Sequence, residues 1–126
     1  MKTITVVLPL PPQILRPNAR AHYMAKARAT SETRYDATLA ATHARDLLHV
    51  GKDFQISRPV VSVRWFFKDA DTRTRDEDNL LAWLKAYFDG IVDSGIVGDD
   101  GGFTHNPPTL IRDKDQRVEI TFKERE

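Results

Sequence analysis

The stretch PVVSVRWFF, from Pro59 to Phe67, decides the fold of this chain. It is a short and almost unbroken apolar run, rich in β-branched and aromatic residues, which is typical of a buried strand. A charged segment, residues 68–76, follows it directly. We therefore expect a buried strand over residues 59–67, and the other elements must supply the layers that cover it.

The N-terminal half supplies a second strand and a long helix. Residues 3–8 are β-branched and apolar and stop at prolines, which predicts a strand. Residues 13–25 predict a polar, basic loop, and a loop of this length usually binds something. An alanine-rich helix is expected over residues 26–50. Its expected N-cap is Thr30 or Ser31, its terminator is Gly51, and its apolar anchors are Tyr35, Leu39 and Leu47.

The C-terminal half completes the predicted fold. Apolar residues at helical spacing, namely Leu80, Leu84, Tyr87, Phe88 and Ile91, predict a helix over residues 78–93 that ends at Gly95. Residues 109–112 and 117–123 predict two strands, joined as a hairpin across residues 113–116. The order β-α-β-α-β-β predicts a single domain over residues 1–126, of α/β (α+β) class, with a small mixed sheet and two main helices.

Composition limits the kinds of site that the chain can build. It has no cysteine, which excludes disulfides and thiolate metal sites and suits a cytoplasmic protein. No stretch reaches membrane-spanning length. Its 19 basic and 18 acidic residues nearly balance, but basic residues dominate 16–34 and acidic residues dominate 76–100. The chain can therefore combine a basic face with an acidic pocket.

The segment RDEDNL, residues 75–80, carries the strongest chemical signal. Asp76 and Asp78 are two residues apart, so an extended chain places both carboxylates on one side. A helix would separate them by roughly 200°. A shared metal ion therefore requires the helix to begin at or after Asp78. The structural alternative is that these acids only cap the helix.

A second acidic stretch, Asp99-Asp100-Gly101-Gly102, strengthens the metal hypothesis, although Asp-Asp-Gly-Gly is also ordinary turn chemistry. Three carboxylates from two segments make a hard oxygen site, which suits Mg²⁺ or, as a substitute, Mn²⁺. Such an ion can polarise a phosphodiester and lower the pKa of an attacking water. His105 is a further, weaker candidate beside this turn.

The motifs RDEDNL at 75–80, KAYFD at 85–89 and Asp99-Asp100, with LPLPP at 8–12, resemble the RusA family of Holliday junction resolvases. The resemblance covers nearly the whole chain in the same element order. It implies a dimeric, magnesium-dependent endonuclease that resolves four-way DNA junctions by paired phosphodiester hydrolysis in recombination and repair. It also implies metal-binding aspartates at Asp76, Asp78 and Asp100, with Asp99 as the adjacent alternative.

The chain departs from this family at one catalytic position. The family's lysine, one helical turn after the second aspartate, is replaced by Ala82, and Lys85 follows three residues later. Asp78 and Lys85 are seven residues apart, close to two helical turns, so they share one stripe of the expected helix. A lysine leans toward the helix N-terminus. We therefore assign Lys85 the catalytic role, against the alternative of a solvated surface lysine.

Contacts with DNA are expected from basic residues, because phosphate contacts supply much of the affinity for nucleic acid. The candidates are Arg16, Arg20, Lys26, Arg28, Arg73 and Arg75. His22 and Tyr23 could stack on exposed bases. A four-way junction needs two cuts, which a two-fold homodimer can make. Trp83 fits either a dimer interface or an ordinary core.

Two other functions remain open from the sequence. One is a metal-dependent nuclease of different substrate preference, acting on linear DNA or RNA. The other is a catalytically weak or silent DNA-binding or structural module, in which the acidic residues only cap a helix. Cleavage of a four-way junction, with and without a chelator, separates these alternatives.

Overall fold

The structure is a computed structural model that describes residues 1–68 and 77–125. It confirms the α+β class and the mixed sheet. The strands are β1 (Thr3–Leu8), β2 (Val60–Phe67), β3 (Thr104–His105), β4 (Thr109–Arg112) and β5 (Arg117–Lys123). The helices are α1 (Tyr23–Leu47), α2 (Glu77–Trp83) and α3 (Lys85–Ser94), with 3₁₀ turns η1 (Gln13–Leu15) and η2 (Asp100–Gly102). The turn η1 and the short β3 were not predicted, whereas η2 lies in the Asp-Asp-Gly-Gly stretch whose composition is typical of a turn.

Strand β2 organises the sheet. It pairs antiparallel with β5 along one edge and parallel with β3 and β4 along the other, while β1 pairs antiparallel with β5 at the outside. The predicted hairpin between residues 109–112 and 117–123 is therefore wrong. β4 and β5 do not pair with each other, because they pair with opposite edges of β2. The pairing of β4 with β2 extends one residue further, through a 2.8 Å hydrogen bond from the Asp113 N–H to the Phe67 carbonyl.

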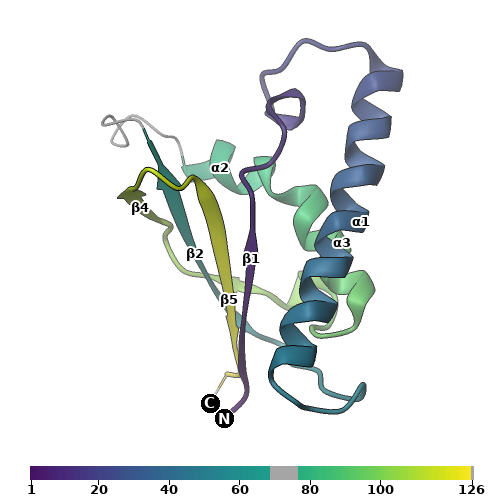
Figure 1. The fold of residues 1–126 in the computed structure, drawn as a ribbon, viewed down its shortest axis with the longest axis vertical. Coiled ribbons are helices and arrows are strands. Elements are labelled where there is room, and N and C mark those ends of the chain that lie inside the picture. Colours follow the sequence, from purple (N-terminus) through teal and green to yellow (C-terminus); the bar gives the residue numbers. More distant parts are fainter. Residues whose placement is uncertain (69–76, 126) are drawn as a thin grey trace.

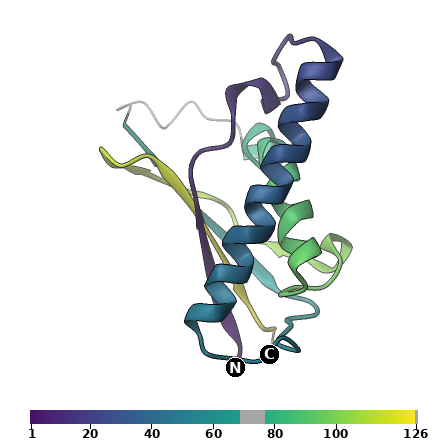
Figure 2. The same ribbon diagram turned by 45° about the vertical axis from the view of Figure 1, so that its right-hand side comes forward.

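One face of the sheet carries the core. In β1 and β5 buried residues alternate with more exposed ones, as expected for strands covered on one side. Helices α1 and α3 lie across the same face (Figures 1 and 2). The largest fully buried side chains come from both layers: Trp65, Phe67, Phe122, Leu84 and Ile91.

Helix α1 begins and ends earlier than predicted. His22 is its N-cap, since the His22 Nδ1 accepts a hydrogen bond of 3.2 Å from the Met24 N–H. The helix ends at Leu47, and His49, two residues before the predicted terminator Gly51, adopts the left-handed conformation, φ 55°. His22 caps the N-terminus in place of the usual Ser or Thr, and His49 adopts the positive φ that usually belongs to a Gly after the C-terminus. The standard capping signals therefore misplaced both ends.

The predicted apolar face of α1 is also wrong. Tyr35, Leu39 and Leu47 are exposed, and the residues that α1 buries are instead Thr33, Ala37 and Ala41. These three residues recur every four positions, so they form one stripe of the helix. Small side chains occupy this stripe because α3 lies too close to α1 for large ones.

Gly90 of α3 makes this close approach possible. A Cβ atom at Gly90 would lie 2.0 Å from the carbonyl oxygen of Arg34 and 2.8 Å from the Cβ of Ala37. Thr38 seals the contact by donating a 2.8 Å hydrogen bond from Oγ1 to the Gly90 carbonyl. The Arg34 guanidinium also binds both carboxylate oxygens of Asp93, at 2.6 and 2.9 Å.

The helix predicted over residues 78–93 is interrupted. It forms α2 and α3, which meet at Leu84. The Leu84 N–H bonds to the carbonyl of Leu81, three residues back, which tightens the turn at that point. Trp83 lies in the core, 3 % exposed, stacked on Trp65 with ring centroids 5.4 Å apart.

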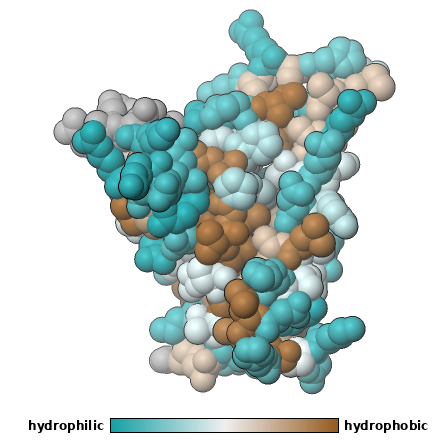
Figure 3. Space-filling model, viewed as in Figure 1, coloured by the Kyte–Doolittle hydropathy of each residue, from teal (hydrophilic) through white to brown (hydrophobic). Residues whose placement is uncertain are grey.

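The space-filling view shows apolar side chains gathered along β1 (Figure 3). A groove of about 530 Å³ lies there between β1 and α1, lined by residues that include Val7, Ala44, Leu47 and Leu48. β1 is the outer strand of the sheet beside β5. Among the described residues, no helix combines the length and apolar character that crossing a membrane requires.

Replacing Gly90 with Ala is expected to destabilise the fold by about 1–3 kcal/mol. Overpacking against backbone atoms that cannot move outweighs the roughly 1 kcal/mol gain in helix propensity. Urea denaturation measures the change. Gly101→Ala is the control, because a Cβ at Gly101 meets nothing closer than 3.6 Å. Equal stability of the Gly90→Ala variant and the wild type would contradict the close approach of α1 and α3.

Candidate active site

Three of the predicted site residues, Asp78, Lys85 and Asp100, meet at a cavity of about 480 Å³ between two separate parts of the chain. Helices α2 and α3 form one wall, and the segment from η2 to β3 forms the other. The lining residues are Asp78, Leu81, Ala82, Lys85 and Phe88 on the helical side, and Asp100, Phe103 and His105 on the other. The cavity therefore brings acidic, basic and aromatic side chains together.

The wall that carries Asp100 is tied to the start of β2. The Ile56 N–H bonds to the Ile96 carbonyl at 2.9 Å, and the Gly98 N–H bonds to the Ile56 carbonyl at 3.0 Å. Gly98 approaches so closely that a Cβ there would lie 2.6 Å from the Ser57 carbonyl oxygen. These bonds fix the position from which η2 begins, and so the position of Asp100.

Lys85 joins the two walls. Its Nζ donates a hydrogen bond of 2.7 Å to Asp100 Oδ2 and another of 2.9 Å to Asp89 Oδ1. The bond to Asp100 crosses the cavity, whereas Asp89 is one turn further along α3. The Lys85 side chain is 64 % exposed, so its ammonium group stays accessible to a solute that enters the cavity.

These contacts shift the titration of both partners. Hydrogen bonds to Asp100 and Asp89 raise the pKa of Lys85. The hydrogen bond from Lys85 lowers the pKa of Asp100. Asp100 therefore keeps its negative charge at pH values below the usual pKa of an aspartate. The cavity thus holds an ionised acid and an ionised base at neutral pH.

His105 lies in an aromatic cluster at the edge of this cavity. Its ring makes edge contacts with Phe88 and Phe103, at centroid distances of 5.5 and 6.0 Å. Desolvation lowers the pKa of His105, and the nearby Asp100 carboxylate acts in the opposite direction. A neutral imidazole beside ionised groups is able to accept a proton.

The structure brings together part of the predicted catalytic set. Asp78, Lys85 and Asp100 all line the cavity, and Asp99 is exposed beside it without lining it. Asp76 lies outside the described residues. Helix α2 begins at Glu77, and Asp78 therefore lies in its first turn. The helix starts one residue earlier than a metal ion shared by Asp76 and Asp78 requires.

The donor set of the cavity fits a hard divalent ion such as Mg²⁺. Mg²⁺ keeps several water ligands and commonly uses one or two protein carboxylates together with substrate phosphates. Asp78 and Asp100 provide two carboxylates. Within residues 1–68 and 77–125, no cluster of three or more acidic or histidine side chains is close enough to hold a metal ion.

The predicted DNA-binding residues occupy different surroundings. Arg20 and Arg28 are exposed and Lys26 is half-buried. Arg16 packs on the protein itself, with its guanidinium carbon 4.3 Å from the ring centroid of Trp83. Arg73 and Arg75 lie outside the described residues.

Two residues at the start of α1 were also expected to contact DNA bases. His22 and Tyr23 stack on each other, with centroids 4.7 Å apart, and Tyr23 is 75 % exposed. One face of the tyrosine is therefore covered by the histidine. The exposed remainder of the ring is accessible from outside.

Sequence reasoning missed Asp89 as a partner of Lys85, although its four-residue spacing from Lys85 was a usable signal. It also missed Phe88 and Phe103 as walls of the site. No sequence signal pairs those two residues, because the fold alone brings α3 against the segment after η2.

Comparisons with known proteins do not identify a family. No protein-family model and no curated protein matches the chain. Among solved structures, the chain is similar over its whole length to 80 % of a Helicobacter pylori MotB periplasmic domain, with 14 % identity and a TM-score of 0.42. It is also similar, over 96 % of its length, to 30 % of a Stenotrophomonas maltophilia thiamine-monophosphate kinase, with 12 % identity and a TM-score of 0.32. Scores this low carry no functional argument.

Replacing Lys85 with Met is expected to raise the pKa of Asp100 toward the ordinary aspartate value, because the hydrogen bond that favours its ionised form is lost. Any stability that this pair contributes is present at neutral pH and disappears as the pH falls through the lowered pKa of Asp100. Carboxyl-carbon NMR titration measures the change. Asp93, whose low pKa comes from Arg34, is the internal control. An unshifted Asp100 would contradict the ion pair.

Proposed function

We propose that this protein is a magnesium-dependent endonuclease that cuts branched DNA, with the four-way junction as its substrate. The observation that carries the proposal is the shared cavity of Asp78, Lys85 and Asp100. Two carboxylates that would hold a divalent cation, with an accessible ammonium group around the same cavity, suit a phosphodiester better than a neutral substrate. The four-way DNA junction is proposed as the substrate because residues 75–80 and 85–89 resemble the RusA family.

The chemistry divides between the ion and the chain. A bound Mg²⁺ supplies a Lewis acid for the phosphate and a more acidic water. Asp78 and Asp100 would hold it. Lys85 lies where it can offset the negative charge that develops on the phosphate oxygens. When Asp100 binds the ion, the hydrogen bond to Asp89 would still orient the Lys85 ammonium group.

The proposal includes a basic surface for the DNA backbone. Arg20 lies in the loop that leads into α1, Lys26 and Arg28 lie in the first turns of α1, and all three would supply phosphate contacts. Two cuts across a four-way junction require two active sites, so the proposed form is a homodimer with one site for each strand. The chain then acts at symmetric positions of the junction.

Asp78→Asn and Asp100→Asn are each expected to lower junction cleavage by more than about 100-fold. Loss of an outer-sphere partner alone costs roughly 10–100-fold, and a direct ligand should cost more. Binding of the junction should persist, because an asparagine side chain has nearly the same shape as an aspartate side chain. Cleavage of a labelled four-way junction in Mg²⁺, and gel-shift binding in a chelator, measure the two effects.

Asp46→Asn is the matched control, because this exposed acid near the end of α1 is not among the residues that line the cavity. Undiminished cleavage by the Asp78→Asn variant would defeat the assigned role. Equal cutting of a linear duplex by the wild type would reject the junction as the specific substrate. No cleavage in Mg²⁺ by the wild type would favour a silent DNA-binding module.

Arg20→Ala and Arg28→Ala are each expected to weaken junction binding and to reduce the salt dependence of the affinity by about one ion. The physical reason is the loss of one phosphate contact in each variant. Binding isotherms over a salt series measure the slope. Lys52→Ala is the control, since this exposed lysine follows the other end of α1. A slope equal to that of the wild type would remove the residue from the interface.

A further inference from the structure

A second cavity of about 190 Å³ opens beside the candidate active site. Asp78, Leu81 and His105 line both cavities, so the two cavities adjoin. Most of the other residues that line the smaller cavity are apolar. Its remaining lining comes from β2, from the α2–α3 junction and from the segment between β3 and β4: Val63, Trp65, Leu80, Leu84, Asn106, Pro107 and Pro108.

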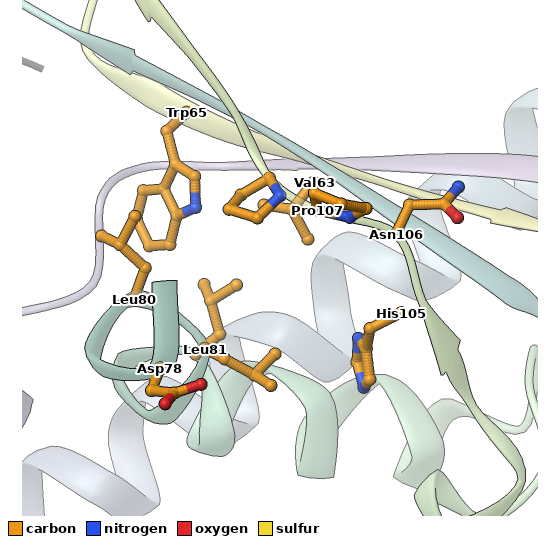
Figure 4. Close-up of a pocket in the computed structure, with 10 residues that line it drawn as sticks. Val63, Trp65, Asp78, Leu80, Leu81, His105, Asn106 and Pro107 are labelled. Carbon is orange, nitrogen blue, oxygen red and sulfur yellow. The ribbon is translucent and has the colours of Figure 1, made fainter. Parts of the chain in front are cut away.

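The close-up shows a slot between two apolar walls (Figure 4). Trp65, Val63 and Pro107 lie on one side of the space, and Leu80 and Leu81 lie on the other. Asn106 belongs to the same segment, but its amide points away from the slot (Figure 4) and donates a 2.8 Å hydrogen bond to Ser62 Oγ. The charged group at the slot is Asp78, on the side shared with the larger cavity.

The size and lining of the slot select a flat ligand with apolar faces. Its volume is below the roughly 300–1,000 Å³ of pockets that hold drug-sized molecules, so it suits a single ring system. We propose that the slot binds one nucleobase of the DNA strand whose phosphate occupies the larger cavity. A base and its phosphate are joined through one sugar, which matches two adjoining cavities with shared walls.

This inference rests on the proposed function and extends it to substrate selection. A base can enter the slot only after it leaves its stack, which costs least where pairing is already interrupted. A branch point provides such a nucleotide. Occupation of the slot would then align one particular phosphate with Lys85 and Asp100, and the nucleotide at the branch would decide where the strand is cut.

The first test measures base binding without cleavage. NMR spectra of the protein are recorded with each deoxynucleoside 5′-monophosphate and with 2-deoxyribose 5-phosphate, in a chelator. Only the nucleotides are expected to shift the methyl signals of Leu81 and Leu84 and the indole signal of Trp65. Equal shifts with the sugar phosphate, or no shift with any nucleotide, would overturn the proposal.

A variant that fills the slot sharpens this test. Leu81 is 40 % exposed, so Leu81→Phe should fold while its larger ring occupies the entrance. It is expected to weaken nucleotide binding about tenfold. Leu39→Phe makes the same exchange at a position of α1 that is 51 % exposed and is the matched control. Unchanged affinity in the Leu81→Phe variant would overturn the assignment.

The second test uses the junction. Placing an abasic site at the branch nucleotide, or using the Leu81→Phe variant, is expected to spread cleavage over several positions. An unchanged cleavage pattern in both would overturn the role in selection. The two proposals fail separately: nucleotide binding without junction cleavage would defeat only the resolvase function, and junction cleavage without nucleotide binding would defeat only the base slot.

Discussion

The contact between the backbones of α1 and α3 is the constraint on which the rest of the structure depends. At Gly90 the two helices approach so closely that a single added carbon would reach the Arg34 carbonyl. This contact sets the distance of α3 from α1, and α3 begins with Lys85. The position of the ammonium group in the cavity therefore follows from a packing requirement five residues, or roughly one and a half turns, further along the helix.

The second half of the site depends on β2. This strand accepts β3 and β4 on one edge and β5 on the other, so the segment between η2 and β4 is drawn alongside it. Asp100 and His105 reach the helices by this route, and Trp65 of the same strand stacks on Trp83, the last residue of α2. The strand that forms the core thus also holds both walls of the cavities together.

Much of the fold was predictable, because local patterns report burial. The strands predicted over residues 59–67 and 117–123 have the correct bounds or are within one residue of them. The failures have specific physical causes. Leu39 and Leu47 were predicted to be core residues. The face of α1 that contacts α3 instead carries small residues, among them Ala37 and Ala41. The pairing of residues 109–112 with β2 depended on a partner distant in the chain.

For the site, the sequence by itself determined the kinds of groups: carboxylates at Asp78 and Asp100, an ammonium group at Lys85 and no thiol. It determined these because side-chain chemistry is a property of each residue alone. Only the tertiary structure decided that Lys85 bridges to Asp100, that His105 joins the two cavities and that an apolar slot lies beside them. Those facts depend on contacts between segments far apart in the chain, and packing of the whole core settles such contacts.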